Sequence, residues 1–338
     1  MNKQTNKYFP PIAISLMLAS VACTSEMGFQ DSDPISQIKL EVIDGTLKVS
    51  DFETFEELIE EKNELEEVSF TNIAQVINSN SNILPNARIS EAGMERLEEF
   101  EGSYLLELLD EDGFVIIDEF LFYLDFDNGL VAVTSNLDKK SELLDKNYAD
   151  DEVLLFYFTD DVISLLESGA SSTVDKGNIN SRVAAGFEPN YENISDNCSW
   201  KKCDNNGHEE QVKYDPETEF EYRLEAKHVY QAAGIYFRLM SEAKHMKRSG
   251  KTFYSSEPTN ITIRYNYQYN SKKKKIGRKS GQGESSQFTR DHNVFYYESS
   301  RGLHSFTLET QFKVFIGGDH GSGYLGWWEL NLQRIRKS

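Results

Sequence analysis

The spacing of apolar residues changes between the two halves of this 338-residue chain, and that change limits the possible folds more than any other feature. In the first half, the apolar residues of the stretch 52–65 recur at near-helical spacing with glutamates between them, which is typical of an amphipathic helix. In the second half, "ITIRYNYQY" (261–269) alternates along its length, which is typical of a strand with one buried face. The sequence predicts an α+β region followed by a region of antiparallel β-strands.

Local signals place the elements of the first half. Asp44-Gly45 lies between two alternating runs, which predicts a hairpin because both turn residues accept a positive φ. Ser50 and Glu53 match a capping box, which predicts that a helix begins there. The other elements predicted for this half are a helix over 90–109, three strands within 113–134, a helix over 140–146, a strand over 153–158 and a last helix capped by Thr159 or Asp160.

Several stretches of the second half read as strands. We expect them to form an antiparallel β-sandwich-like domain, with a flattened barrel as the alternative. A stretch rich in Ser, Gly and Asn separates the halves and is predicted to be a linker. The strands are predicted within 220–230, 234–247, 261–269, 294–298, 304–316 and 324–335; the parts of the chain are predicted as a signal peptide (1–22), a tether (23–36), an acidic α+β domain (37–168), a linker (169–197) and a β-rich domain (198–338).

The two halves also differ in charge. Residues 31–170 contain 35 Asp and Glu against 8 Lys and Arg, whereas residues 171–338 contain 20 acidic and 25 basic residues. Such different balances favour two separately built units. An acidic half would repel phosphates, so we expect no nucleic-acid partner.

The first apolar run extends from Ile12 to Ala22 and follows Lys3 and Lys7. Its 11 residues are too few for a membrane-spanning helix, which needs about 20. The length and the preceding positive charges are typical of a signal peptide.

Small residues precede Cys23, and the stretch from Ser20 to Cys23 resembles the lipobox of bacterial lipoproteins. It departs from that pattern at Ser20, where Leu is usual, and Ser20 and Ala22 would also suit ordinary signal peptidase. The resemblance implies that Cys23 is acylated, which would explain an odd cysteine in an exported protein. Thr24 at the next position favours the outer membrane in such lipoproteins.

The lipobox is followed by "LEVIDGTLKVSDFETFEEL" (40–58), by an acidic α+β part and by "YRLEAKHVYQAAGIYFRL" (222–239). In this order the chain resembles uncharacterised lipoproteins of Bacteroidota. The resemblance implies a lipid-anchored location at the outer membrane or the cell surface. It implies no reaction.

The motif "CSWKKC" places Cys198 and Cys203 close enough to pair. They are either a disulfide or half of a metal site with His208 as a third ligand. Structural zinc needs four ligands, and no fourth stands at a suitable spacing. In an oxidising compartment the disulfide is the better interpretation.

The glycine-rich stretch "GGDHGSGYLGWW" (317–328) contains an Asp, a His and a Ser, the residue types of nucleophilic catalysis, but it is not G-x-S-x-G. A flexible hairpin loop is the simpler interpretation, with the two tryptophans on opposite faces of the next strand. Ligand binding is the alternative, because an aromatic face beside a polar loop suits stacking on sugar rings. The candidate ligand-binding residues are Asp319, His320, Trp327 and Trp328.

Three further motifs have a structural interpretation beside the functional one. "DFDNG" (125–129) resembles a calcium loop but fails the EF-hand pattern, so we expect a hairpin turn. "KKKKIGRK" (272–279) would suit phosphorylated lipid headgroups, an acidic glycan or the protein's own acidic half, or else form a solvated loop. The tyrosines at 265, 267 and 269 form either an aromatic binding strip or, as we expect, the buried face of a strand.

No motif identifies a catalytic residue, a metal ligand or a cofactor site, and none of the six histidines belongs to an H-E-x-x-H pattern. The first hypothesis is a non-enzymatic, lipid-anchored binding or adhesion protein for a glycan or an envelope protein. The alternatives are an extracellular hydrolase using Asp319 and His320, and a structural subunit of an outer-membrane assembly.

Overall fold

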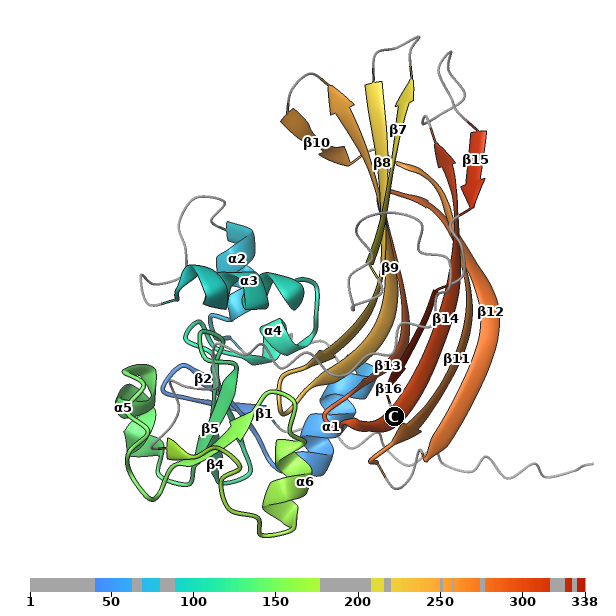
Figure 1. Cartoon of the computed structure of the whole chain (residues 1–338). Helices are drawn as coiled ribbons and strands as arrows, with labels where there is room; N and C mark the ends of the chain where they lie inside the picture. The colour runs from blue at the N-terminus through green and yellow to red at the C-terminus, as the bar shows by residue number, and fades with distance from the viewer. Residues whose placement is uncertain are drawn as a thin grey trace, which may run out of the picture. The chain divides into compact units, whose positions relative to one another are not determined.

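The computed structural model describes residues 40–62, 69–79, 89–176, 208–215, 220–249, 252–256, 258–273, 277–316, 326–329 and 333–337 (Figure 1). Residues Lys39–Ser338 group into one compact unit. The predicted signal peptide and tether lie outside the described residues. No helix within the described ranges is both long enough and apolar enough to cross a membrane.

The first region is built on a six-stranded sheet whose strands follow one another in chain order. Neighbouring strands are antiparallel except β2 and β3, which are parallel because a long helical connection lies between them. The strands are β1 (Leu40–Ile43), β2 (Thr46–Val49), β3 (Phe114–Ile117), β4 (Phe120–Asp125), β5 (Leu130–Thr134) and β6 (Leu154–Tyr157). The helices are α1 (Phe52–Glu61), α2 (Ile73–Ser79), α3 (Glu91–Glu99), α4 (Leu105–Leu108), the 3-10 helix η1 (Leu137–Lys139), α5 (Lys140–Leu144) and α6 (Val162–Glu167).

Most of the elements predicted for this region are confirmed. Asp44 and Gly45 form the β1–β2 turn with φ of 48° and 79°. The three strands within 113–134 are β3, β4 and β5, and the "DFDNG" motif forms the turn of the β4–β5 hairpin. The helix over 140–146 and the strand over 153–158 correspond to α5 and β6.

Two predicted helix starts are wrong by one or two residues. Asp51, not Ser50, caps α1, and its Oδ1 accepts a hydrogen bond from the Thr54 amide at 2.7 Å. Asp161, not Thr159 or Asp160, caps α6, and its Oδ1 accepts from the Ser164 amide at 3.1 Å. In each case the cap is the carboxylate that stands three residues before a free amide of the first turn.

The single helix predicted over 90–109 is also wrong. The structure has two helices there, α3 and α4, and the chain turns between them at Gly102 with a φ of 69°. A residue with positive φ ends a right-handed helix, and glycine adopts that conformation without strain.

The second region contains two five-stranded antiparallel sheets. The strand order is β10-β9-β8-β7 in one, with β13 also paired to β9, and β12-β11-β14-β15 in the other, with β16 also paired to β14. The strands are β7 (His208–Asp215), β8 (Phe220–Ala232), β9 (Phe237–Ser249), β10 (Thr252–Ser256), β11 (Thr259–Ser271), β12 (Arg278–Thr289), β13 (Asp291–Ser299), β14 (Leu303–Ile316), β15 (Gly326–Glu329) and β16 (Gln333–Lys337).

The strongest alternating stretches of the sequence form β8, β11 and β14, as predicted. The strand expected over 234–247 begins only at Phe237, because Gly234 forms a turn with a φ of 73°. The strand expected over 324–335 is two strands, β15 and β16, which pair with different parts of β14. Strands β7, β10 and β12 have no counterpart among the predicted strands.

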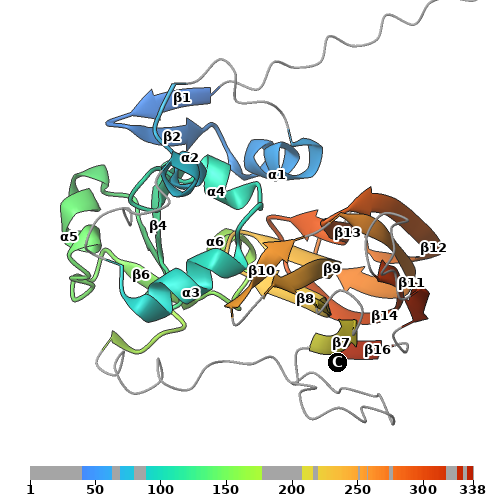
Figure 2. The ribbon, with the colours of Figure 1, turned by 90° about the horizontal axis from the view of Figure 1, so that it is seen from above.

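Apolar side chains of the two sheets pack into common clusters. One cluster joins Ala226 of β8 and Ala243 of β9 to Ile263 of β11 and Phe312 of β14. Both views of the ribbon show β8 and β9 on one side of the β-rich region and β11 on the other (Figures 1 and 2). The molecule therefore has an α+β fold with antiparallel sheets in its second region.

The tight turn between β8 and β9, at Gly234, contacts the first region through backbone hydrogen bonds. The Gly234 carbonyl accepts a hydrogen bond from the Val162 amide at 2.9 Å, and the Gly234 amide donates to the Phe158 carbonyl at 2.7 Å. A Cβ at this position would lie 2.4 Å from Cγ2 of Val131. Only glycine fits here, because it has no Cβ and accepts the positive φ.

Candidate functional site

A polar cleft of about 540 Å³ lies where helices of the acidic half meet turns of the basic half. Glutamates of α1 and polar residues of α6 line it, together with cations from the turns that follow β11 and β13. The lining residues are Glu53, Glu56, Glu57, Ser164, Glu167, Ser168, Lys272, Lys273 and Arg301. Four of these side chains are carboxylates and three are cations.

The apolar face of α1 fixes the position of its glutamates. Phe55, Leu58 and Ile59 are buried in the core, so the helix cannot rotate without exposing them. Glu53 and Glu57 are exposed and stand four residues apart, which places them on the same side of the helix.

Arg301 forms a bidentate ion pair in the cleft. Its side chain is 11% exposed, and two of its nitrogens donate to the two carboxylate oxygens of Glu167 at 3.0 and 2.8 Å. Its Nη1 also donates to the Ser164 hydroxyl at 3.2 Å. Burial alone would lower the pKa of Arg301, but the Glu167 carboxylate outweighs burial and raises it above its usual value.

Lys273 forms a second ionic contact between the halves. Its Nζ lies 3.0 Å from Oε1 of Glu56 and 3.1 Å from both carboxylate oxygens of Glu60. Burial would lower the pKa of Lys273, but these two carboxylates outweigh it and raise the pKa. Of the partners considered for the basic run 272–279, Lys273 therefore contacts the protein's own acidic half.

Buried Asp161 links α6 to the turns of the cleft through hydrogen bonds. It is 2% exposed; one of its oxygens caps α6, and the other accepts a hydrogen bond from the Gly302 amide at 2.8 Å. The Gly302 carbonyl accepts in turn from the Lys272 amide at 3.0 Å. One carboxylate thus connects α6, the Arg301 turn and the segment after β11.

Lys272 differs from the other two cations of the cleft. Lys273 and Arg301 are held by carboxylates, whereas Lys272 has no ion pair within the described ranges. It lines the cleft and is only half-buried, so it can contact a ligand there. The cleft as a whole can offer hydrogen-bond donors and acceptors of both charges to a polar ligand.

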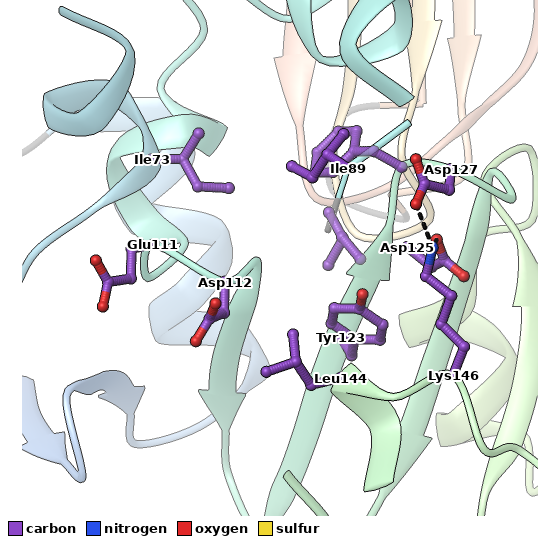
Figure 3. Close-up of a pocket in the computed structure, with 11 residues that line it drawn as sticks. Ile73, Ile89, Glu111, Asp112, Tyr123, Asp125, Asp127, Leu144 and Lys146 are labelled. Carbon is purple, nitrogen blue, oxygen red and sulfur yellow. Dashed lines mark hydrogen bonds and ion pairs between the residues drawn. The ribbon is translucent and has the colours of Figure 1, made fainter. Parts of the chain in front are cut away.

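A second hollow, of about 30 Å³, has room for about one water molecule (Figure 3). Among its four carboxylates, Asp125 and Asp127 have structural partners: Asp127 forms an ion pair with Lys146 and accepts from the Ser90 amide at 2.7 Å. Burial would raise the pKa of Asp127, but these contacts outweigh burial and lower it. Asp125 accepts from the Tyr148 hydroxyl at 2.6 Å. No group of three or more His, Cys, Asp or Glu in the described part of the chain could hold a metal ion.

Most of the site residues predicted from the sequence lie outside the part of the chain that the structure describes. The lipidation site Cys23, the cysteines Cys198 and Cys203, and the loop residues Asp319 and His320 lie outside the described residues. Trp327 and Trp328 form part of β15, where they pair with Phe315 and Val314 of β14. Their role in ligand binding stays a prediction.

The tyrosines of β11 belong to the core rather than to an open strip, as expected. Tyr269 is 4% exposed, and Tyr265 and Tyr267 are half-buried. The rings of Tyr265 and Tyr267 lie 5.2 and 5.1 Å from the ring of Tyr296 on β13.

Of the residues of the cleft, the sequence singled out only Lys272 and Lys273, as part of the basic run 272–279. Glu56, Glu167 and Arg301 stand in no motif, and the opposite charge of the two halves was the one further signal. A scan against protein-family models gives no match for this chain, and a search of curated proteins finds no significant similarity.

Proposed function

We propose that this is a lipid-anchored, non-enzymatic binding protein of the cell envelope, and that its ligand lies in the cleft lined by α1, α6 and the turns after β11 and β13. The observation that carries the proposal is the fixed array of charges in that cleft. Arg301 and Lys273 are held in place by Glu167, Glu56 and Glu60, so little side-chain freedom is lost when a ligand arrives.

The chemistry of the cleft favours a ligand that is polar throughout. Carboxylates accept hydrogen bonds from hydroxyl and amino groups, and Lys272 supplies a cation that no carboxylate of the described residues neutralises. A glycan or a polar segment of an envelope protein has such groups. A nucleic acid would be repelled by the four glutamates.

The location is supported by the N-terminal sequence. An apolar run too short to span, followed by Ser20 to Cys23, is consistent with cleavage and acylation at Cys23. A single acyl chain gives only weak membrane binding, so an outer-membrane anchor would depend on the multiple chains that lipoproteins carry. The clusters shared by the two five-stranded sheets support a sandwich-like second domain.

The test uses the chain from Thr24 to Ser338, which keeps every described residue. It is screened against neutral, acidic and amino-substituted glycans, and affinities are measured for whichever binds. We expect Lys272→Glu to weaken binding about tenfold or more, because it removes a charge-assisted contact and adds a like charge to the cleft.

Arg290→Glu is the matched control. Arg290 is exposed and stands at the other end of β12, so the same change of charge should leave binding intact. Equal loss in both variants, or no loss in Lys272→Glu, would show that the ligand does not bind in the cleft. The hydrolase hypothesis rests on Asp319 and His320 and stays a prediction.

A further inference from the structure

The charges that line the cleft do not all neutralise one another. Two of its three cations, Lys273 and Arg301, are held by glutamates, whereas Lys272 has no ion pair with any residue that the structure describes. Glu57 of α1 lines the same cleft, is exposed, and likewise has no ion pair within the described ranges. Lys272 and Glu57 are also not paired with each other. The cleft therefore presents an ammonium group and a carboxylate that are both open to a ligand.

Helix α1 already binds one ammonium group of the protein itself. Nζ of Lys273 lies 3.0 Å from Oε1 of Glu56 and 3.1 Å from both carboxylate oxygens of Glu60, four residues further along the helix. Glutamates four residues apart on a helix repel each other, so a cation between them is stabilising. Glu53 and Glu57 repeat this spacing, and both line the cleft. The ammonium group of a ligand can contact Glu57 as Lys273 contacts Glu60.

The two open charges restrict which ligands the cleft can bind. A ligand that enters the cleft displaces water from Lys272 and Glu57. A neutral ligand would leave both charges without water and without a partner, which is unfavourable. A purely anionic ligand would be repelled by Glu57, and a purely cationic one by Lys272. A ligand that carries both charges forms a charge-assisted hydrogen bond with each residue.

The other lining residues favour a sugar over a peptide. All nine are Glu, Ser, Lys or Arg. Peptides are usually recognised through apolar pockets for their side chains or through pairing with a sheet edge, whereas a sugar offers hydroxyl groups around its whole ring. The volume of about 540 Å³ lies within the range of about 300–1,000 Å³ that is usual for small-ligand sites, so a short segment of a glycan is bound.

We infer that the cleft takes a zwitterionic glycan, in which neighbouring sugars carry a free ammonium group and a carboxylate. Glu57 accepts hydrogen bonds from the ammonium group, and Lys272 donates to the carboxylate. The inference rests on the function proposed for the cleft and narrows its ligand to one chemical class.

The experiment compares three matched disaccharides by titration calorimetry on the chain from Thr24 to Ser338. The first is glucosamine linked to glucuronic acid, with its amine free. The second is its N-acetylated form, which lacks the ammonium group, and the third is its carboxyl-reduced form, which lacks the carboxylate. We expect the zwitterionic disaccharide to bind best and each of the others to bind about tenfold more weakly, because each loses one charge-assisted contact.

Single variants connect each charge of the ligand with one residue. Glu57→Gln should remove the preference for the free amine over the N-acetylated form and keep the preference for the carboxylate. Lys272→Gln should do the reverse. Glu98→Gln is the matched control, because Glu98 is exposed on α3 and lies outside the lining of the cleft, so both preferences should persist.

Three results would overturn the inference: no binding of the zwitterionic disaccharide, equal binding of all three, or preferences that neither variant changes. Tighter binding of the tripeptide Gly-Ser-Ser, which carries the same two charges, would do so as well and would assign the cleft to a peptide. If another ligand of the glycan screen still binds and is weakened by Lys272→Glu, the proposed function stands without this inference. If no ligand depends on Lys272, both fail.

Discussion

The two regions of the molecule bury different kinds of side chain. In the first region, strands β3 and β5 are buried along their whole length, and their residues are aliphatic or aromatic apart from Thr134. Both regions bury tyrosines and hydroxyl groups, such as Tyr123 and Thr46 in the first, but the first region contains no histidine, whereas the core of the second contains several. His228 is 2% exposed and hydrogen-bonds to Thr310, and the Tyr296 hydroxyl donates to Ser241 at 2.9 Å.

This difference predicts that the two regions respond differently to acid. All six histidines of the sequence lie in the second half, and three of them, His228, His245 and His292, are buried. The first region depends instead on carboxylates such as Asp127, whose pKa is lowered by its partners. Alternation in the sequence predicts a buried face in either region, but it does not show which titratable side chains lie on that face.

The largest expected effect is at the turn where the two regions touch. Gly234→Ala places a Cβ 2.4 Å from Val131 and 2.9 Å from Val162, at a φ of 73°. Strain and overpacking together should lower the free energy of unfolding by about 4 kcal/mol. Urea unfolding followed by circular dichroism measures this loss.

Gly277→Ala is the control for that substitution. Gly277 also has a positive φ, of 56°, but a Cβ there would meet nothing within 4 Å. Its cost should be only the backbone term of about 1 kcal/mol. Equal losses at the two glycines would show that Gly234 is not packed between the regions.

A smaller effect comes from buried His228. Burial lowers its pKa to about 3, so it stays neutral in the folded protein, whereas in the unfolded chain it takes up a proton near pH 6.5. Its contribution to stability is therefore complete above pH 6.5 and is lost as the pH falls from 6.5 toward 3. The loss by pH 4.5 should be about 3 kcal/mol.

Unfolding at several pH values, followed by tryptophan fluorescence, measures this dependence, because all three tryptophans lie in the second half. His228→Gln should flatten the profile between pH 6.5 and 4.5. His304→Gln, at an exposed position, should leave it unchanged. Carboxylates such as Asp127 stabilise above their ordinary pKa of about 4 and lose that contribution only at lower pH, which separates the two regions.

Periodicity predicted the elements that bury one face or both, namely β3 to β6 and the alternating strands β8, β11 and β14. It missed β12, because "RKSGQGESSQFT" is exposed along most of its length and has no apolar pattern. It also joined α3 to α4, because a glycine within an apolar pattern is compatible with a helix until tertiary contacts place the turn.

The contacts that form the cleft could not be predicted from the sequence. Arg301 and Glu167 are 134 positions apart, and nothing in either local sequence indicates the other. Residues of the predicted linker give a similar case: the Thr173 amide donates to the Leu155 carbonyl at 3.0 Å, and Val174 is 5% exposed. A polar, irregular stretch can pack on a sheet through backbone hydrogen bonds that composition does not encode. The domain boundaries stay a prediction.

The most direct test of the contact between the acidic and basic halves is zero-length carbodiimide cross-linking of the purified chain, read by mass spectrometry. This reaction joins an ammonium group only to a carboxylate in direct contact. We expect links from Lys273 to Glu56 or Glu60 and from Lys62 to Glu298, whose charged atoms lie 2.8–3.1 Å apart. If every link joined two residues of the same half, and neither Lys273 nor Lys62 were linked to a glutamate of the other half, the cleft and the function proposed for it would be contradicted.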